Sequence, residues 1–176
     1  PENAHRLRVK NPIISDTELL SIQNLDSHGW QTRTIDITYP KGNADKKDML
    51  SALNRICKES EEAIEQGFSF IVLSDKKLGP KNIALSSLLA CSTVHHHLIT
   101  KEKRTRIGIV IETGEAREVH HHCLLIGYGA DAINPYLAFE SLWQARQDGL
   151  LDQISFDDMV KAYKKGVAKL SLIHIS

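Results

Sequence analysis

Two runs of three histidines contain the side chains of this sequence best suited to metal binding or proton transfer. They are His95–His97 and His120–His122, and Glu112 and Glu115 lie shortly before the second run. Imidazoles and carboxylates bind transition metals, and imidazoles also exchange protons near neutral pH. Successive residues on a helix point about 100° apart, so three adjacent histidines cannot all bind one ion. A metal site would need a spacing such as HxxxH or HExxH, and neither occurs in the sequence.

Projection onto helices predicts that one histidine of each run faces the core. His96 falls on the stripe of Leu85, Leu89 and Ser92. His122 falls on the stripe of Ala116, Val119, Cys123 and Ile126. A buried neutral imidazole needs a hydrogen-bond partner for each ring nitrogen. We therefore interpret His96 and His122 as structural residues that tie helices together. A metal site between the two helices, a proton relay and an interface contact are the alternatives.

The composition is that of a folded, single-domain protein without a nucleic-acid or membrane signature. The chain has 176 residues, of which 41% are hydrophobic, and its 22 basic and 22 acidic side chains give a formal net charge of zero. The apolar runs are too short to cross a bilayer. Cys57, Cys91 and Cys123 form no CxxC pair and are typical of reduced thiols. We therefore expect a cytoplasmic protein.

Strand and helix patterns alternate along the chain. The expected strands cover residues 34–39, 68–75, 106–112 and 130–134, and the expected helices cover 46–66, 83–99, 116–127 and a stretch that begins at Pro135. Gly67 and Gly127 are read as helix ends. This rhythm predicts an α/β fold of repeated βα units with a mainly parallel sheet.

The carboxyl ends of such strands are where ligands and chemistry gather. The polar residues there are Thr38 and Tyr39, then Ser74 and Asp75, then Glu112, Thr113 and Glu115, then Asn134. The candidate functional residues among them are Asp75, Glu112, Thr113, Glu115 and Asn134.

Thr113 and Glu115 also have a local interpretation. Thr113 is expected to cap the helix that follows it, and Glu115 is expected in the first turn, where the helix dipole favours an anion. Alternatively, Thr113 and Arg117 receive an anionic ligand at this helix start.

Several strings resemble one family. They are TIDITYP at 34–40, LSD at 73–75, VHHHLI at 94–99 and RTRIGIVIETGEAREVHHHCLLIGYGADAINPYLAFESL at 104–142. These strings resemble the central domain of the large subunit of glutamate synthase, and the likeness extends over residues 1–169.

The resemblance implies a place inside a multidomain enzyme. Family members have an N-terminal glutamine amidotransferase domain with a cysteine nucleophile, this central domain, an FMN-binding barrel with an iron–sulfur cluster, and a C-terminal β-helix. A small electron-donating subunit or ferredoxin supplies the electrons. The central domain resembles an incomplete βα barrel, and it is not where the family keeps its nucleophile, flavin or cluster. The resemblance therefore implies no cofactor in this chain.

The expected function is architectural: the chain connects and orients the glutaminase and FMN-binding domains so that ammonia passes between them. Asp75, Glu112, Thr113, Glu115 and Asn134 are then candidates for domain contacts or for the channel wall. A stand-alone metal-dependent enzyme that uses the histidine runs is one alternative. A non-catalytic scaffold subunit is the other.

Three segments follow from this interpretation. Residues 1–33 are expected to be the linker from a missing upstream amidotransferase domain and the beginning of the domain proper, and 34–169 the central domain, truncated at its end. The last seven residues, LSLIHIS at 170–176, resemble the in-frame translation of a transposon adapter and are expected to be a non-native tail. A short terminal strand is the alternative for this tail.

Overall fold

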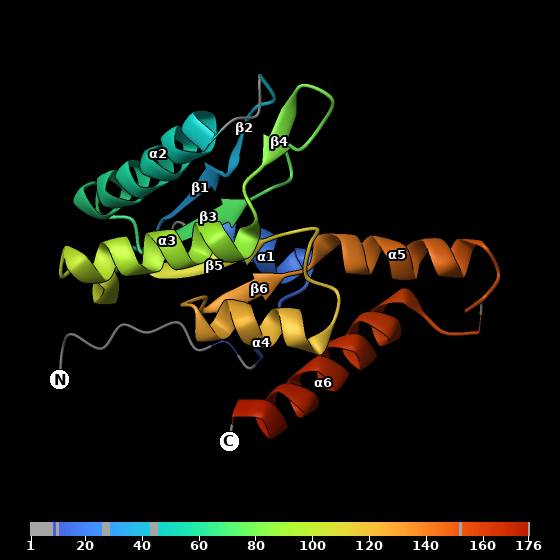
Figure 1. Cartoon of the computed structure of the whole chain (residues 1–176). Helices are drawn as coiled ribbons and strands as arrows, with labels where there is room; N and C mark the ends of the chain where they lie inside the picture. The colour runs from blue at the N-terminus through green and yellow to red at the C-terminus, as the bar shows by residue number, and fades with distance from the viewer. Residues whose placement is uncertain (1–8, 10, 26–28, 43–45, 152, 176) are drawn as a thin grey trace, which may run out of the picture.

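The centre of the protein is an open sheet of parallel strands (Figure 1). The computed structural model describes residues 9, 11–25, 29–42, 46–151 and 153–175. The sheet has four strands in the order β1-β3-β5-β6, and they are β1 Thr32–Asp36, β3 Phe70–Ser74, β5 Gly108–Glu112 and β6 Ala132–Asn134. The strands lie side by side in chain order, as in consecutive βα units of a barrel. The predicted α/β class with a parallel sheet is confirmed.

Helices cover both faces of this sheet (Figure 1). One face is covered by α2 Lys46–Glu65, α3 Ser87–Thr100 and α4 Val119–Gly127, and α6 Phe156–Ile175 packs against α4. The other face is covered by α1 Asp16–Gln23. A short 3-10 helix, η1 Arg104–Arg106, precedes β5.

The middle strands are apolar because both of their faces are buried. In β3, Ile71 and Leu73 belong to the large core shared with α2, α3 and α4. Val72, between them, belongs to a smaller core with Leu19 and Ile22 of α1. Neighbouring residues of one strand thus anchor opposite helical layers.

The strand predicted over 34–39 is divided in two. β1 ends at Asp36, whose Oδ1 accepts a hydrogen bond from the backbone N of Thr38 at 2.8 Å. This turn starts β2 Thr38–Pro40, which pairs antiparallel with β4 Asn82–Ala84 in a separate two-stranded sheet. The helix predicted from residue 83 therefore begins later, at Ser87.

Both predicted helix-ending glycines lie at the ends of helices. Gly67 has φ +86° and follows α2, with the N–H of Phe68 bonded to the carbonyl of Ala63. Gly127 is the last residue of α4, as predicted, but it has no positive φ; the left-handed residue after this helix is Gly129 at +109°.

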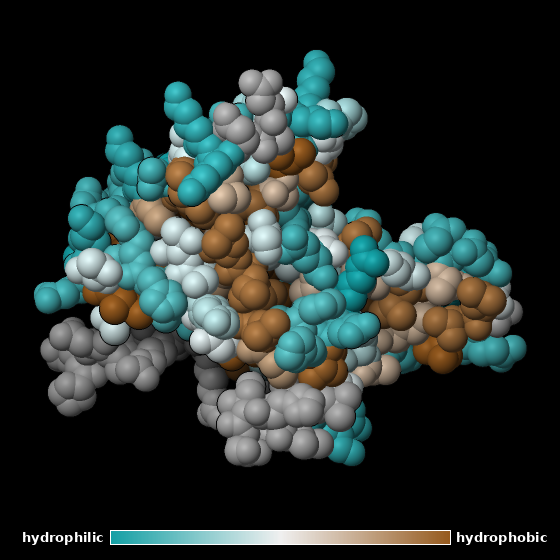
Figure 2. All heavy atoms as spheres, in the orientation of Figure 1, coloured by the Kyte–Doolittle hydropathy of each residue, from teal (hydrophilic) through white to brown (hydrophobic). Residues whose placement is uncertain are grey.

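The helix α5 Tyr136–Gln147 extends away from the sheet (Figure 1). We call α5, the connection 148–155 and the first turn of α6 the arm. Phe139, near the base of the arm, is buried, whereas Trp143 is 46% exposed and stacks edge-on against Phe156 with ring centroids 5.6 Å apart. Hydrophobic side chains gather over the outer end of the arm (Figure 2).

The ends of the chain extend beyond the predicted domain core. Much of the predicted linker, residues 1–8, 10 and 26–28, lies outside the described residues, but Ile13 and Ile14 are fully buried and Ile13 forms a parallel bridge with Ile133. The backbone of α6 continues through Ile175, so residues 170–175 are helical and not the short strand considered as an alternative. The non-native origin of residues 170–176 stays a prediction.

Candidate functional site

The strand-end residues lie at one edge of the sheet, as the parallel arrangement requires. Ser74 pairs in register with Glu112, and Glu112 pairs with Asn134. Asp75 follows β3 directly and Thr113 follows β5. All five side chains are buried, with exposed fractions of 6% or less.

Asp75 and Thr113 form the centre of a buried hydrogen-bond network. The hydroxyl of Thr113 donates to Asp75 Oδ2 at 2.7 Å, and the backbone N of Gly114 donates to the same carboxylate oxygen at 3.0 Å. Thr113 Oγ1 lies 2.5 Å from Ser87 Oγ. Because the single proton of Thr113 is directed to Asp75, Ser87 is the donor in this second bond. The network therefore connects the ends of β3 and β5 to the start of α3.

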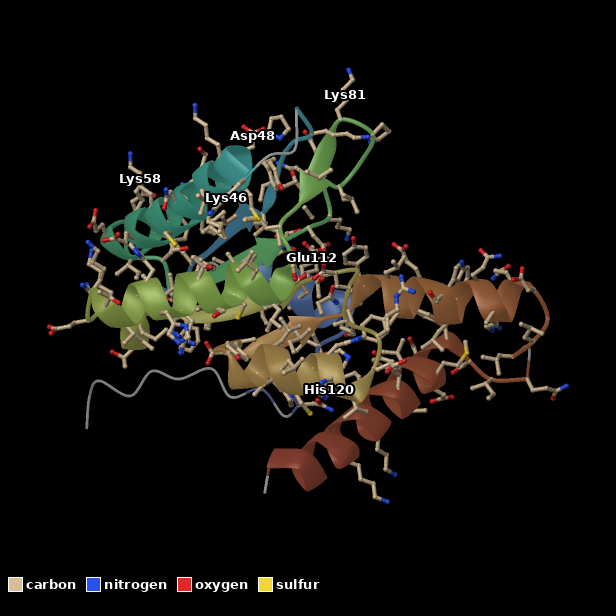
Figure 3. All side chains as sticks on the ribbon, in the orientation of Figure 1. Lys46, Asp48, Lys58, Lys81, Glu112 and His120 are labelled. Carbon is tan, nitrogen blue, oxygen red and sulfur yellow. The ribbon has the colours of Figure 1, made fainter. Side chains whose placement is uncertain are left out.

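Glu112 has its own partners at this edge, and Figure 3 labels it near the start of α3. Ser74 Oγ donates to Glu112 Oε2 at 2.5 Å, and Lys76 Nζ lies 3.2 Å from Glu112 Oε1. The Lys76 ammonium is also 5.3 Å from the centre of the Tyr136 ring. Burial, and then the charge of Asp75, raise the pKa of Tyr136, so its phenol stays protonated at neutral pH.

The local interpretation of Thr113 and Glu115 as the start of α4 is wrong. The N-cap of α4 is Glu118, which forms a capping box with His121. Glu115 instead caps α3: its Oε2 accepts hydrogen bonds from the backbone N of Ser87 at 2.7 Å and from Ser86 Oγ at 3.3 Å. The carboxylate predicted for the first turn of the following helix therefore stabilises the start of α3 instead.

Arg117 lies between Glu115 and α4 and is exposed. Its backbone N donates to His121 Nδ1 at 3.2 Å and its carbonyl accepts from Tyr163 Oη at 2.8 Å. Its guanidinium forms no ion pair with any residue in the part of the chain that the structure describes. Arg117 and Thr113 do not converge on a helix start as the alternative required, because Thr113 is fully buried in the Asp75 network.

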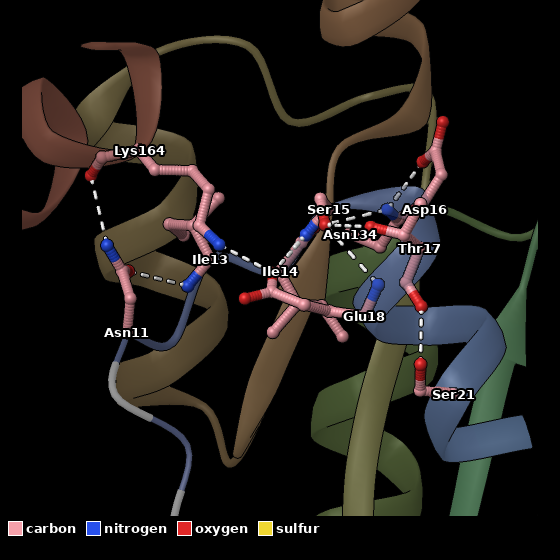
Figure 4. A network of polar contacts seen from close by, with 10 residues as sticks. All are labelled: Asn11, Ile13, Ile14, Ser15, Asp16, Thr17, Glu18, Ser21, Asn134 and Lys164. Atoms are coloured by element: carbon pink, nitrogen blue, oxygen red, sulfur yellow. Dashed lines mark hydrogen bonds and ion pairs between the residues drawn. The ribbon is translucent and has the colours of Figure 1, made fainter. Parts of the chain in front are cut away.

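Asn134 is separated from this network because its side chain points to the N-terminal segment (Figure 4). Its Nδ2 donates to the carbonyl of Ile14 at 3.2 Å and to Asp16 Oδ1 at 2.8 Å. Only its backbone carbonyl, which accepts from the N–H of Thr113, contacts the other strand-end residues. Asn134 therefore fixes α1 to the sheet.

His122 faces the core, as predicted. It is fully buried, and its Nε2 lies 2.9 Å from the hydroxyl of Tyr163 in α6. Since Tyr163 donates its proton to the carbonyl of Arg117, His122 carries its proton on Nε2 and has a bare Nδ1 without a partner among the described residues. Burial, assisted by nearby His121, lowers the pKa of His122 to about 4. The imidazole is therefore neutral at physiological pH.

The prediction for His96 is wrong: this residue is exposed, and its Nδ1 contacts the carbonyl of Ser92 at 2.8 Å in its own helix. The buried face of α3 is instead formed by Ala90, Cys91, Val94 and Leu98. The helical projection counted Leu85 as part of the buried face of this helix. Leu85 is buried, but it lies before the first residue of α3, so the projection assigned the wrong face. His96 and His122 consequently have unrelated partners.

The side chains that could bind a metal ion or a cluster do not gather at one place among the described residues. No group of three or more His, Cys, Asp or Glu among the described residues is arranged to hold a metal ion. Burial raises the pKa of Cys91 to about 12, and burial followed by the charge of Glu61 raises the pKa of Cys57 to about 11. Both therefore remain thiols at neutral pH. Iron–sulfur clusters are held by several cysteines together, and the described residues contain no such group of ligands.

Sequence reasoning missed Ser87, Lys76 and Tyr136, which complete the strand-end network. Lys76 directly follows Asp75, and Tyr136 follows Pro135 at a helix start, so their positions beside strand ends were available from the pattern. No local pattern in the sequence marks Ser87, because it lies next to Thr113 only after the strands have paired in the sheet.

Comparison with known proteins identifies the family. A family model described as "Glutamate synthase central domain" matches residues 1–175. The chain is 39% identical to "Glutamate synthase [NADH]" of Schizosaccharomyces pombe and 38% identical to the "Glutamate synthase [NADPH] large chain" of Bacillus subtilis, over 92% and 95% of its own length. A "Ferredoxin-dependent glutamate synthase" of Antithamnion sp. is 34% identical over 95% of the chain.

These relatives are much longer than this chain, which spans 8%, 10% and 12% of their respective lengths. Among the described residues, no helix is both long and apolar enough to cross a membrane. The match over nearly all of its residues shows that this chain belongs to the glutamate synthase central domain family.

Proposed function

We propose that this chain holds the glutaminase domain and the FMN-binding synthase domain of a cytoplasmic glutamate synthase at a fixed separation. In the reaction that family membership implies, glutamine is hydrolysed in one domain and the ammonia released travels to 2-oxoglutarate in the other. Reduced FMN then reduces the resulting imine to glutamate, with electrons that arrive through the iron–sulfur cluster. Fixing two sites in this way is a proximity effect on the scale of domains.

The observation that carries this proposal is a direct connection between the first described segment and the last helix. Lys164 Nζ of α6 lies 2.5 Å from Glu18 Oε2 of α1, and both residues belong to the neighbourhood drawn in Figure 4. Asn11 Nδ2 donates to the carbonyl of Lys164 at 3.2 Å, and Asn11 Oδ1 accepts from the N–H of Ile13. The two ends of the domain are therefore held to each other as well as to the sheet.

The strand-end network supports a positioning role. Asp75, Thr113 and Ser87 use their hydrogen-bonding capacity on one another and on backbone N–H groups. Buried, mutually satisfied groups of this kind make a rigid arrangement of strands and helices. A rigid body is what a spacer between two active sites requires.

The range of relatives also supports this role. Enzymes named for NADH, for NADPH and for ferredoxin all match the same region. A domain common to enzymes with different electron donors fits a task that is independent of the donor. Holding the glutaminase and synthase sites in place is such a task, whichever of a small electron-donating subunit or ferredoxin supplies the electrons.

The arm is our candidate for contact with a neighbouring domain. Leu150 is 75% exposed and Ile154 is 44% exposed, beside the half-exposed Trp143. Grouped apolar side chains on a surface are typical of interfaces. In the relatives this region is about a tenth of the polypeptide, and in such a polypeptide a neighbouring domain would cover these side chains.

The experiment reverses the charge of the connection between the two ends in the full-length enzyme. Glu18→Lys places two cations together, and Glu18→Lys/Lys164→Glu restores an attractive pair. Ammonia released to solvent per glutamate formed is measured beside glutaminase activity. We expect more ammonia to escape in Glu18→Lys and normal coupling in the double variant, with glutaminase activity unchanged.

Lys161→Glu is the matched control because Lys161 lies on the same helix, is 75% exposed and pairs only locally with Asp158. It should leave coupling unchanged. Coupling that is normal in Glu18→Lys, or disturbed equally in Lys161→Glu, would overturn the proposal.

A further inference from the structure

A pocket with a volume of about 640 Å³ opens beside the strand-end network. Asp75 and Gly114 line it at the ends of β3 and β5, and the starts of α3 and α5 and one side of α4 form its walls. Pockets of this size are typical of small-molecule sites, and the carboxyl edge of a parallel sheet is where such ligands bind.

Much of the pocket wall is apolar and made of leucines. They come from the loop after β3, from α3, α4 and α5, and they are Leu78, Leu88, Leu124, Leu125 and Leu137. A ligand that fills this space therefore needs an aliphatic or otherwise apolar part.

Two hydrogen-bond donors in the same pocket have unused capacity. The Arg117 guanidinium forms no ion pair with any described residue. His121 Nδ1 accepts from the backbone N of Arg117 and of Glu118, so the imidazole proton is on Nε2. No described residue accepts a hydrogen bond from that Nε2. A guanidinium and an imidazole N–H that line one pocket are suited to bind a carboxylate there.

A hydrogen-bond acceptor, Glu115, lines the pocket together with these two donors. Glu115 uses Oε2 to cap α3, and its Oε1 has no hydrogen-bond partner among the described residues. Glu115 also lines the pocket, and it forms no ion pair with Arg117. Its free oxygen is therefore available to a cation inside the pocket.

We propose that this pocket binds a free α-amino acid with an aliphatic side chain. Arg117 and His121 bind the α-carboxylate, Glu115 binds the α-ammonium group, and the leucines pack against the side chain. The three polar groups match the two charges of an amino acid, and the apolar wall matches the rest. This site goes beyond the domain-positioning role and does not depend on it.

The first experiment is isothermal titration of the purified chain with L-leucine. Isopentylamine lacks the carboxylate of leucine, and isocaproic acid lacks its ammonium group, so the pair tests each half of the site. We expect L-leucine to bind with a Kd of about 1 mM or tighter, and each analogue to bind at least about ten-fold more weakly.

Three conservative variants test the role of each polar group in ligand binding. Arg117→Gln removes the cation, Glu115→Gln removes the anion but keeps an oxygen for the α3 cap, and His121→Asn keeps an acceptor in place of Nδ1 while removing Nε2–H. Each should weaken L-leucine binding by about ten-fold. Arg117→Gln should leave the Tm unchanged, and the other two variants, which alter groups at helix starts, should lower it only slightly. Arg106→Gln is the control, because Arg106 is an exposed arginine that lines a different pocket.

Specific results of these experiments would overturn or support the proposal. No heat of binding at about 10 mM L-leucine, equal binding of isocaproic acid, or an equal effect of Arg106→Gln would each overturn the proposal. Binding of N-acetyl-leucine as tight as that of leucine would also overturn it, in favour of a peptide carboxylate from another part of the polypeptide. Loss of binding in the three variants with the control intact would support it.

Discussion

The Nε2 atom of His122 lies 2.9 Å from the hydroxyl of Tyr163, and this hydrogen bond joins α4 to α6. The hydroxyl donates onward to the carbonyl of Arg117, so two successive hydrogen bonds connect α4, α6 and the loop before α4. His122 takes part as a neutral imidazole at physiological pH, because its environment lowers its pKa to about 4.

Stability should therefore fall as the pH drops from 6.5 toward 4. The unfolded histidine binds a proton near pH 6.5, whereas the folded one does so only near pH 4, and acid therefore favours the unfolded chain. The full difference between the two pKa values corresponds to roughly 3 kcal/mol in the free energy of unfolding. Denaturant unfolding at several pH values should show this loss, and His122→Gln, which keeps a donor near Nε2, should reduce it. His96→Gln, at an exposed position, should leave the pH dependence unchanged; an equal change in both variants would contradict the assignment.

Thr113→Val should destabilise the protein by about 1–3 kcal/mol, because it removes a buried hydrogen bond to Asp75 and leaves the Ser87 hydroxyl without its acceptor. Valine keeps the shape of the threonine side chain, so the decrease in the free energy of unfolding measures the contribution of the hydroxyl. Thr100→Val is the matched control, since Thr100 is exposed and its hydroxyl bonds only within α3. Urea unfolding measures the free energy of unfolding of both variants. Similar free energies of unfolding for both would show that the network adds little.

Gly129→Ala should destabilise by about 2–4 kcal/mol. The residue has φ +109°, and an added Cβ would lie 2.2 Å from His95 Nδ1. The same ring nitrogen accepts a hydrogen bond from Arg104 Nε, so the imidazole cannot move without cost. Gly127→Ala, two residues earlier, meets no atom within 4 Å and should be neutral or stabilising. Differential scanning calorimetry would detect the opposite shifts, and a lowered Tm in both variants would contradict this account.

The purified chain should self-associate at high concentration through the arm, because Leu150 and Ile154 are exposed there. Leu150→Lys should shift the sedimentation equilibrium toward monomer. Leu20→Lys changes another exposed leucine, 56% accessible on α1, and should not do so. Self-association that persists in Leu150→Lys would place the contact elsewhere.

Local signals in the sequence were sufficient for most elements, and one was overlooked. The string SDTE at 15–18 is a capping box, and the structure shows both of its hydrogen bonds at the start of α1. The signal could have predicted this helix inside the expected linker. The turn at Asp36 was less accessible, since it is fixed by pairing between β2 and β4 over more than forty residues.

The sequence by itself determined the parallel α/β class, the edge where Asp75, Glu112 and Thr113 gather, the burial of His122 and, through the ETGEAREVHHH block, the family. These follow from periodicities and motifs that are local in the chain. Only the tertiary structure decided that Glu115 caps α3, that Asn134 binds the N-terminal segment, and that His96 faces solvent. The physical reason is that sheet order brings together groups that are distant in sequence, such as Ser87 and Glu115, and a polar side chain binds the nearest group in space.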